Sequence, residues 1–152
     1  MTGTNTAAGR PAYVVNVETF LHRDGRWLLI RRSAAEAHAA GDVCGVGGKV
    51  EAPTLGPEVL EETARREVAE EIGVELDPTA LRYVESSLFV TADGDDVINI
   101  VFTGPVPAEA VPVVAEPDEV AEILWLTLDE ALAEPACQPW TRRALERAAA
   151  IS

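Results

Sequence analysis

Hydrophobic and polar residues alternate near the start of the chain, over residues 13–21. A two-residue period is typical of a β-strand with one buried face. A turn follows at Asp24-Gly25, and residues 27–32 return as a second, strongly apolar strand. We therefore expect the chain to open with a β-hairpin, with Arg31 and Arg32 pointing to opposite sides of its second strand.

The hydrophobic period lengthens to four in the middle of the chain, which indicates an amphipathic helix. Proline at position 57 and glycine at position 73 lie where helices commonly begin and end. The predicted stripe fixes which face of the helix turns toward the core. It consists of Leu60, Ala64, Val68 and Ile72.

Further elements are predicted after this helix. They are strands at 81–92 and 97–103 around a turn at 93–96, a proline-rich connection at 104–117, a strand at 120–126, a short helix that Thr127 and Glu130 begin as a capping box, and a closing helix at 140–151. Strands on both sides of a helix, followed by late helices, indicate a mixed α+β fold.

The length of 152 residues predicts one domain, which we place at residues 11–152. Residues 1–10 are small and polar, lack the apolar core of a signal peptide, and are expected to form a disordered lead-in. No apolar run is long enough to span a membrane. Cys44 and Cys137 do not form a metal-type pair, so we expect two reduced thiols and a cytoplasmic protein.

The charge of the chain limits its partners. Twenty-six acidic residues against twelve basic ones give a net charge of −14. Such a balance argues against a nucleic acid or an anionic membrane as the partner. A phosphorylated ligand would need cations beside it, because both ligand and protein are negative.

The predicted helix is strongly acidic, with seven glutamates and two arginines in residues 58–75. Glu67, Glu70 and Glu71 have the spacing that places side chains on one helical patch. One interpretation is a solvated acidic face. However, like charges at this spacing destabilise a helix by roughly 0.2 to 0.5 kcal/mol per pair. A patch of carboxylate oxygens also suits a hard cation such as Mg²⁺ or Mn²⁺, which favours a metal site.

The same stretch resembles the Nudix box, G-x5-E-x7-R-E-U-x-E-E-x-G-U, in which U is a bulky apolar residue. The loop half departs from the pattern, because nine residues instead of five separate Gly48 from Glu58. This difference indicates a four-residue insertion around Ala52–Leu55. The helical half matches at Glu58, Arg66, Glu67, Val68, Glu70, Glu71, Gly73 and Val74.

The resemblance implies an α/β/α sandwich with a mixed β-sheet between helices. It also implies a metal-dependent pyrophosphohydrolase, which hydrolyses a nucleoside diphosphate linked to another group. The general base is expected to be Glu67 or Glu70, with Glu119 on a later loop as the alternative, and Arg66 is expected to hold Glu58 or a neighbouring carboxylate. The implied ligands of Mg²⁺ or Mn²⁺ are Glu67, Glu70, Glu71, Glu58 and the Gly48 carbonyl.

Residues 31–51 resemble the region before the box in mutator-type nucleoside triphosphate pyrophosphohydrolases. This likeness implies that Arg32 and His38 hold the nucleotide, and we include Lys49 beside them. The leading substrate class is a nucleoside or deoxynucleoside triphosphate, oxidised forms included. Homodimers are frequent in the family.

Two alternatives stay open at this point. An isopentenyl-type diphosphate isomerase shares a variant of the box, but it also requires a catalytic cysteine, and Cys44 has no supporting motif. A non-catalytic nucleotide sensor on the same fold usually lacks box glutamates, and here they are all present.

Overall fold

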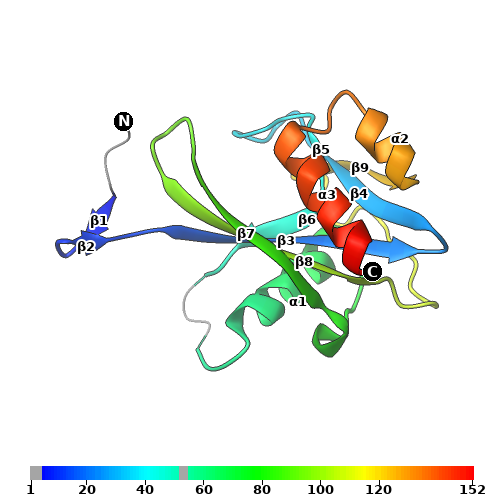
Figure 1. Ribbon diagram of the computed structural model, residues 1–152, viewed down its shortest axis with the longest axis horizontal. Helices are drawn as coiled ribbons and strands as arrows, with labels where there is room; N and C mark the ends of the chain where they lie inside the picture. The colour runs from blue at the N-terminus through cyan, green and yellow to red at the C-terminus, as the bar shows by residue number, and fades with distance from the viewer. Residues whose placement is uncertain (1–4, 52–54) are drawn as a thin grey trace.

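A mixed seven-stranded sheet with helices on both faces forms the body of the protein. The computed structural model describes residues 5–51 and 55–152 (Figure 1). The strands are β1 (Thr6–Ala7), β2 (Arg10–Pro11), β3 (Val14–Arg23), β4 (Arg26–Arg32), β5 (Val43–Cys44), β6 (Val46–Lys49), β7 (Arg82–Val90), β8 (Asp96–Pro105) and β9 (Val120–Leu126). The helices are α1 (Val59–Ile72), α2 (Leu128–Ala133), α3 (Pro139–Ile151) and the 3₁₀ turn η1 (Pro78–Ala80).

Strand β3 is the centre of the sheet. It pairs in parallel with β8 along one edge, from Val14 beside Val97 to His22 beside Pro105. Its other edge is shared by two antiparallel partners, β6 along residues 16–19 and β4 along residues 21–23. The main path through the sheet is β5-β4-β3-β8-β7, and β9 pairs with the outer edge of β4. The glycine-rich strand β6 is thus held by backbone hydrogen bonds to β3.

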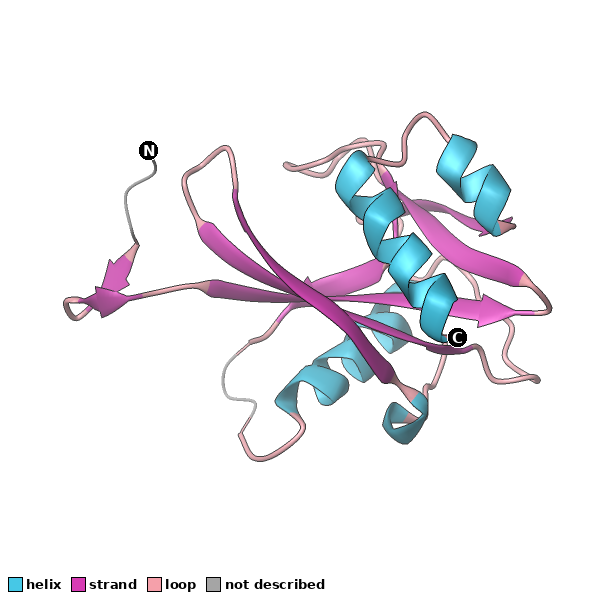
Figure 2. Ribbon diagram, viewed as in Figure 1, coloured by secondary structure: helices cyan, strands magenta, loops and turns pink. Residues whose placement is uncertain are grey.

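The period-two pattern of β3 and β4 sorts their side chains between two hydrophobic layers. Leu21, Leu28 and Ile30 pack in a cluster with Val68 and Ile72 of α1. The intervening residues turn the other way, where Phe20, Trp27 and Leu29 contact α2 and α3. Figure 2 shows α1 on one side of the strands and α2 and α3 on the other. The α/β/α sandwich with a mixed sheet is confirmed.

Helix α1 ends where its sequence predicts. Gly73 follows the last helical residue with φ 67°, a left-handed conformation that glycine adopts without strain, and its N–H donates to the Ala69 carbonyl. Ala64, Val68 and Ile72 of the predicted stripe are buried, whereas Leu60 near the first turn is half-buried. The stripe therefore attaches α1 to the sheet most firmly toward its C-terminal half.

Most predicted elements are present. Both hairpins form, β9 has the predicted bounds, and α2 begins with the predicted capping box of Thr127 and Glu130. The strands β5 and β6 were not predicted, because glycine is a poor strand former and only the pairing with β3 holds β6 extended. Residues 6–7 pair with residues 10–11 as β1 and β2, so the described part of the expected lead-in at 1–10 takes part in a small hairpin.

Some expectations fall outside the described part of the chain. Residues 1–4 of the lead-in and residues 52–54 of the loop insertion are not among the described residues. Among residues 5–51 and 55–152, none of the helices has the length and apolar character that crossing a membrane requires.

Candidate active site

Two carboxylates of α1 are buried against the sheet. The Glu67 and Glu71 side chains lie one helical turn apart, and these residues are only 6% and 3% exposed. Each directly precedes a buried apolar residue, Val68 or Ile72, so the rotation of the helix that buries the stripe also carries both acids inward. Ionised carboxylates in such a position require a counter-charge, a proton or a metal ion.

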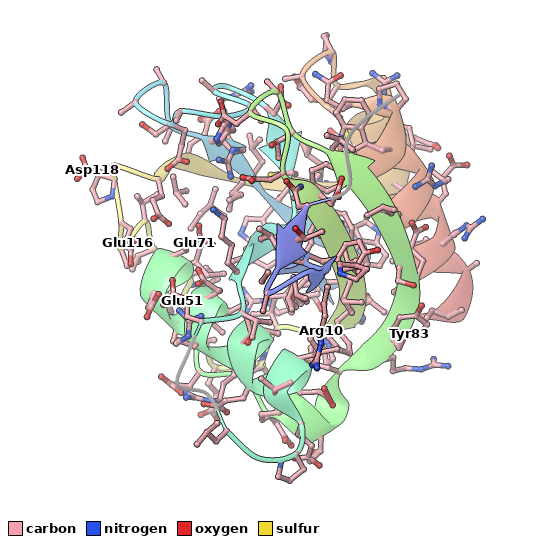
Figure 3. The ribbon with its side chains drawn as sticks, turned by 90° about the vertical axis from the view of Figure 1, so that its left-hand side faces the viewer. Arg10, Glu51, Glu71, Tyr83, Glu116 and Asp118 are labelled. Atoms are coloured by element: carbon pink, nitrogen blue, oxygen red, sulfur yellow. The ribbon has the colours of Figure 1, made fainter. Side chains whose placement is uncertain are left out.

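A third carboxylate, that of Glu119, completes a cluster with these two. Each of the three residues offers an oxygen atom, and the oxygens lie within 4.8 Å of one another. Glu119 is exposed and belongs to the irregular segment before β9. Figure 3 shows Glu71 on the same side of the molecule as Glu116 and Asp118, which belong to that segment. We call Glu67, Glu71 and Glu119 the carboxylate cluster.

The end of α1 brings this segment to the helix. The last carbonyl groups of a helix lack intrahelical partners. Here the Val113 N–H donates to the Ile72 carbonyl at 3.0 Å, and the Ala115 N–H donates to the Glu71 carbonyl at 2.9 Å. The Glu119 carbonyl also accepts from the N–H of the residue after β4, at 2.8 Å. The segment is thus anchored at both ends, which places Glu119 beside Glu71.

The two buried members of the cluster have strongly raised pKa values. Burial raises the pKa of Glu67 to about 7, and the neighbouring Glu70 adds to the rise while the Arg66 guanidinium opposes it. Burial also raises the pKa of Glu71 to about 9, with further contributions from the charges of Glu67 and Glu119. The Gly47 N–H acts in the opposite direction, because it stabilises the ionised Glu71. Without a cation Glu71 therefore holds a proton at neutral pH, and Glu67 is partly protonated.

Arg66 fastens the polar face of α1 to strand β6. Its Nη1 lies 2.8 Å from Glu67 Oε1 and 3.3 Å from Glu70 Oε2. Its Nη2 donates to the Lys49 carbonyl at 3.0 Å. The planar guanidinium suits this forked arrangement. The expected partner was Glu58 or a neighbouring carboxylate; the two nearest carboxylates are neighbours on the same helix, and Glu51 lies farther off at 4.0 Å.

Strand β6 lies very close to the cluster, and glycine makes this possible. A side chain at Gly48 would overlap the Glu67 carboxylate. The absence of a Cβ thus leaves room for a buried carboxylate between helix and sheet. The close approach explains why a glycine pair precedes the acidic helix.

Two predicted metal ligands lie outside the carboxylate cluster. Glu70 is exposed and bound to Arg66. Glu58 precedes α1 in a left-handed conformation with φ 62°. It lies nine positions before Glu67, which corresponds to a helical rise of about 14 Å. The metal-binding roles of both residues and of the Gly48 carbonyl stay predictions.

Of the predicted substrate-binding residues, Arg32 ends β4, His38 lies on the loop after β4, and Lys49 ends β6. Arg32 pairs with Glu36 at 2.7 Å and donates to the carbonyl of His38. The His38 Nε2 lies 3.3 Å from Asp93 Oδ2 in the turn between β7 and β8. Lys49 is exposed. Contact with a nucleotide stays a prediction for each of them.

The donor atoms of the cluster fit a hard divalent cation. All three are carboxylate oxygens, the ligand type that Mg²⁺ and Mn²⁺ prefer. The Oε2 atom of Glu71 is buried and has no hydrogen-bond partner within the described part of the chain. Such an orphaned acceptor is rare in native proteins and is what a metal ligand looks like without its ion. The sequence predicted Glu119 only as an alternative general base and not as a metal ligand. The run of acidic residues before β9 was the feature of the sequence that could have indicated its place in the cluster.

Comparison with known proteins decides the family. The family model described as the NUDIX domain matches residues 12–148. The chain belongs to the Nudix family. Among solved structures, a MutT NUDIX hydrolase from Burkholderia pseudomallei is 31% identical, with a TM-score of 0.74 over 90% of this chain and 98% of that one. The MutT protein from Methanosarcina mazei Go1 is 28% identical, with a TM-score of 0.74 over 91% of this chain and 94% of that one.

A more distant Nudix structure shows the same fold with a ligand. The NUDIX domain of Shewanella oneidensis NrtR, complexed with ADP ribose, is 19% identical, with a TM-score of 0.76 over 97% of this chain and 93% of that one. No curated protein matches the chain. The family model and the MutT relatives make this protein a Nudix hydrolase, of a family that acts on nucleoside diphosphate derivatives and generally uses divalent metals. The isomerase and sensor alternatives are thereby set aside.

Proposed function

We propose that this Nudix hydrolase is a Mg²⁺- or Mn²⁺-dependent pyrophosphohydrolase of nucleoside or deoxynucleoside triphosphates. The observation that carries the metal part is the carboxylate cluster, three oxygens within 4.8 Å of one another at a site where two of the acids are buried. A protein with a net charge of −14 repels a polyphosphate. A cation held by the cluster offsets this repulsion.

In the proposed site Glu67, Glu71 and Glu119 hold the ion, and Arg66 keeps the Glu67 carboxylate in place. The cation supplies charge neutralisation on the phosphates and makes water more acidic. Holding the ion occupies the three cluster acids, which leaves exposed Glu70 as the candidate that takes the proton from the attacking water. Glu70 is a residue that the sequence also nominates for this role.

The triphosphate part of the proposal has separate support. Residues 31–51 resemble mutator-type pyrophosphohydrolases, and the MutT structures at 31% and 28% identity agree with that likeness. Arg32, His38 and Lys49 are proposed to contact the nucleotide. ADP-ribose, the ligand of the NrtR domain, belongs among the compounds tested as the competing substrate class.

The test is product release from a panel of nucleoside triphosphates, oxidised triphosphates and ADP-ribose, with Mg²⁺, with Mn²⁺ and with excess EDTA. We expect pyrophosphate and a nucleoside monophosphate from a triphosphate, and no turnover in EDTA. Turnover that survives EDTA would refute the metal requirement, and hydrolysis of ADP-ribose alone would refute the substrate class.

Two matched variants separate the assigned roles. Glu119→Gln should weaken Mn²⁺ binding, measured by calorimetry, because it removes one charged ligand of the cluster. Glu70→Gln should lower kcat by about a hundredfold, a typical contribution of a general base, and calorimetry on the same variant tests whether Glu70 also holds the ion, as the sequence predicts. If Glu70→Gln retains parental kcat, the base lies elsewhere, and Glu67 is the remaining residue of the box that we nominate.

A further inference from the structure

A chain of polar side chains crosses the middle of the sheet on the face away from α1. The Asn16 Nδ2 donates to Asn99 Oδ1 at 2.8 Å, and the Asn99 Nδ2 donates to Glu18 Oε1 at 3.3 Å. The other oxygen of Glu18, Oε2, accepts from the backbone N–H of Gly45 at 3.0 Å. The face follows from strand alternation, since Val17 packs with α1 whereas Phe20 packs with α3. We call Asn16, Glu18 and Asn99 the polar relay.

The polar relay connects three strands. Asn16 and Glu18 belong to β3, Asn99 belongs to β8, and Gly45 is the residue directly before β6. The approach of Gly45 is close, because a Cβ there would lie 2.9 Å from Cγ of Glu18. The Glu18 carboxylate thus holds the start of β6 at a site where no larger residue fits.

Strand β6 in turn forms the wall beside the buried carboxylates. Gly48 leaves the space that the Glu67 carboxylate fills. The Lys49 carbonyl accepts from Arg66, the residue that also contacts Glu67. Among the described strands β6 pairs only with β3, and besides this short ladder its position depends on the burial of Val46 against α1, on Arg66 and on the relay.

We propose that the polar relay is a positioning device for the metal site: Glu18, oriented by Asn99, holds Gly45 and so fixes strand β6 against the carboxylates of Glu67 and Glu71. In this role the relay acts through the backbone of β6 and not by direct contact with the cation or the substrate. Groups that orient the groups around a metal commonly change metal affinity or activity by about 10- to 100-fold when they are removed. The inference rests on the proposed function, because it assumes that the carboxylate cluster binds a cation.

The hydrogen-bonding capacity of the relay predicts a distinctive mutational pattern. Glu18 is acceptor-only when ionised and receives two donors. In Glu18→Gln, the side-chain oxygen still accepts from Gly45, and its NH₂ group can donate to Asn99 if the amides of Asn99 and Asn16 turn over. We therefore expect this variant to retain near-parental behaviour. Glu18→Leu removes both acceptors and leaves the Gly45 N–H unpaired.

Asn99→Asp replaces the NH₂ group that donates to Glu18 by an acceptor oxygen. It thereby brings a second carboxylate against Glu18. We expect at least about a tenfold loss of Mn²⁺ affinity and of kcat for this variant and for Glu18→Leu. Combining Asn99→Asp with Glu18→Gln restores a donor–acceptor match with the net charge of the parent, so the double variant should recover most of the loss. A role limited to general stability would not produce this recovery.

The experiment measures Mn²⁺ affinity of the metal-free protein by calorimetry, kcat and KM on the best triphosphate, and hydrogen exchange of the Gly45 amide. The matched control is Thr103→Val, because Thr103 Oγ1 makes a buried hydrogen bond to the Phe20 carbonyl between the same two strands but away from β6. We expect the control to lower the melting temperature while leaving Mn²⁺ affinity and Gly45 exchange unchanged. Glu18→Leu should accelerate Gly45 exchange and lower kcat more than it raises KM.

Mn²⁺ affinity within about twofold of the parent in folded Glu18→Leu, or no recovery in a folded double variant, would overturn the positioning role. If Asn99→Asp does not fold, Glu18→Leu, which buries no added charge, decides the question by itself. A parent that binds Mn²⁺ but releases no pyrophosphate would refute the proposed function, and the Mn²⁺ affinities would still test the relay.

Discussion

Glu71→Gln is the substitution for which the structure makes the most quantitative prediction. It keeps the size of the side chain and removes one charge from the carboxylate cluster. Glu71 is 3% exposed, and its pKa is raised to about 9 by burial, by Glu67 and by Glu119. Such a carboxyl group ionises easily in the unfolded chain but not in the folded protein. A rise in pH therefore lowers the stability of the folded state.

The sign and size follow from linkage. Because the folded pKa of Glu71 lies above the ordinary value of 4.5, its contribution to stability is complete below about pH 4.5 and is lost as the pH rises to about 9. Over 2.5 pH units inside that window the loss is about 3 kcal/mol, at 1.36 kcal/mol per unit. Glutamine does not titrate. The free energy of unfolding of the metal-free variant, relative to that of the parent, should therefore increase by about 3 kcal/mol between about pH 5 and about pH 7.5.

The assay is thermal melting of both proteins in EDTA at these two pH values, and again with added Mn²⁺. For a chain of this length, 3 kcal/mol corresponds to roughly 6 to 12 °C in melting temperature. With Mn²⁺ the order should reverse, since binding to the folded state stabilises the parent more. Turnover of the variant should fall at least about a hundredfold, because an electrostatic contribution of several kcal/mol is lost.

The control for this prediction is Glu75→Gln, just beyond the same helix. The Glu75 side chain is 79% exposed and pairs only loosely with Arg65, at 3.5 Å. We expect Glu75→Gln to show no pH-dependent gain in stability over the parent. Its melting temperature should also rise as much as that of the parent when Mn²⁺ is added. If Glu71→Gln also matches the parent, both in turnover and in the rise of melting temperature on adding Mn²⁺, Glu71 holds no metal and the assignment of the cluster is wrong.

Three further substitutions test other parts of the molecule. Arg32→Ala should raise KM with little change in kcat in initial-rate measurements, because phosphate positioning away from the reacting bond is uniform binding. An unchanged KM would limit Arg32 to its contacts with Glu36 and the His38 carbonyl. Gly48→Ala should lower Mn²⁺ affinity by about tenfold or more in calorimetry, because its methyl group occupies the space of the Glu67 carboxylate, and parental affinity would contradict that geometry. Glu85→Ala should cost about 1 to 3 kcal/mol in urea unfolding without changing kcat, because Glu85 is buried beside two arginines of α3, and a loss of kcat in folded protein would contradict a purely structural role.

The sequence by itself determined the features that depend on local periodicity. Alternation in residues 13–21 predicted the strand that became β3, whereas the burial of both its faces, by Leu21 on one side and Phe20 on the other, is a finding of the structure. The stripe along α1 and the glycine at position 73 predicted where the helix packs and where it ends. The matched box predicted the family, because fixed residue types at fixed spacing record the chemistry of one helix face.

Tertiary structure alone decided which acids meet. Glu70 and Glu71 are adjacent in sequence, yet helical rotation exposes the first and buries the second. Glu119 joins them from 48 positions farther along than Glu71, because backbone N–H groups of its segment pair with the free carbonyls at the end of α1. Likewise β6 becomes a strand only through its pairing with β3. Spacing along one element specifies which side chains share a face, whereas contacts between elements depend on long-range hydrogen bonds and packing that no local pattern records.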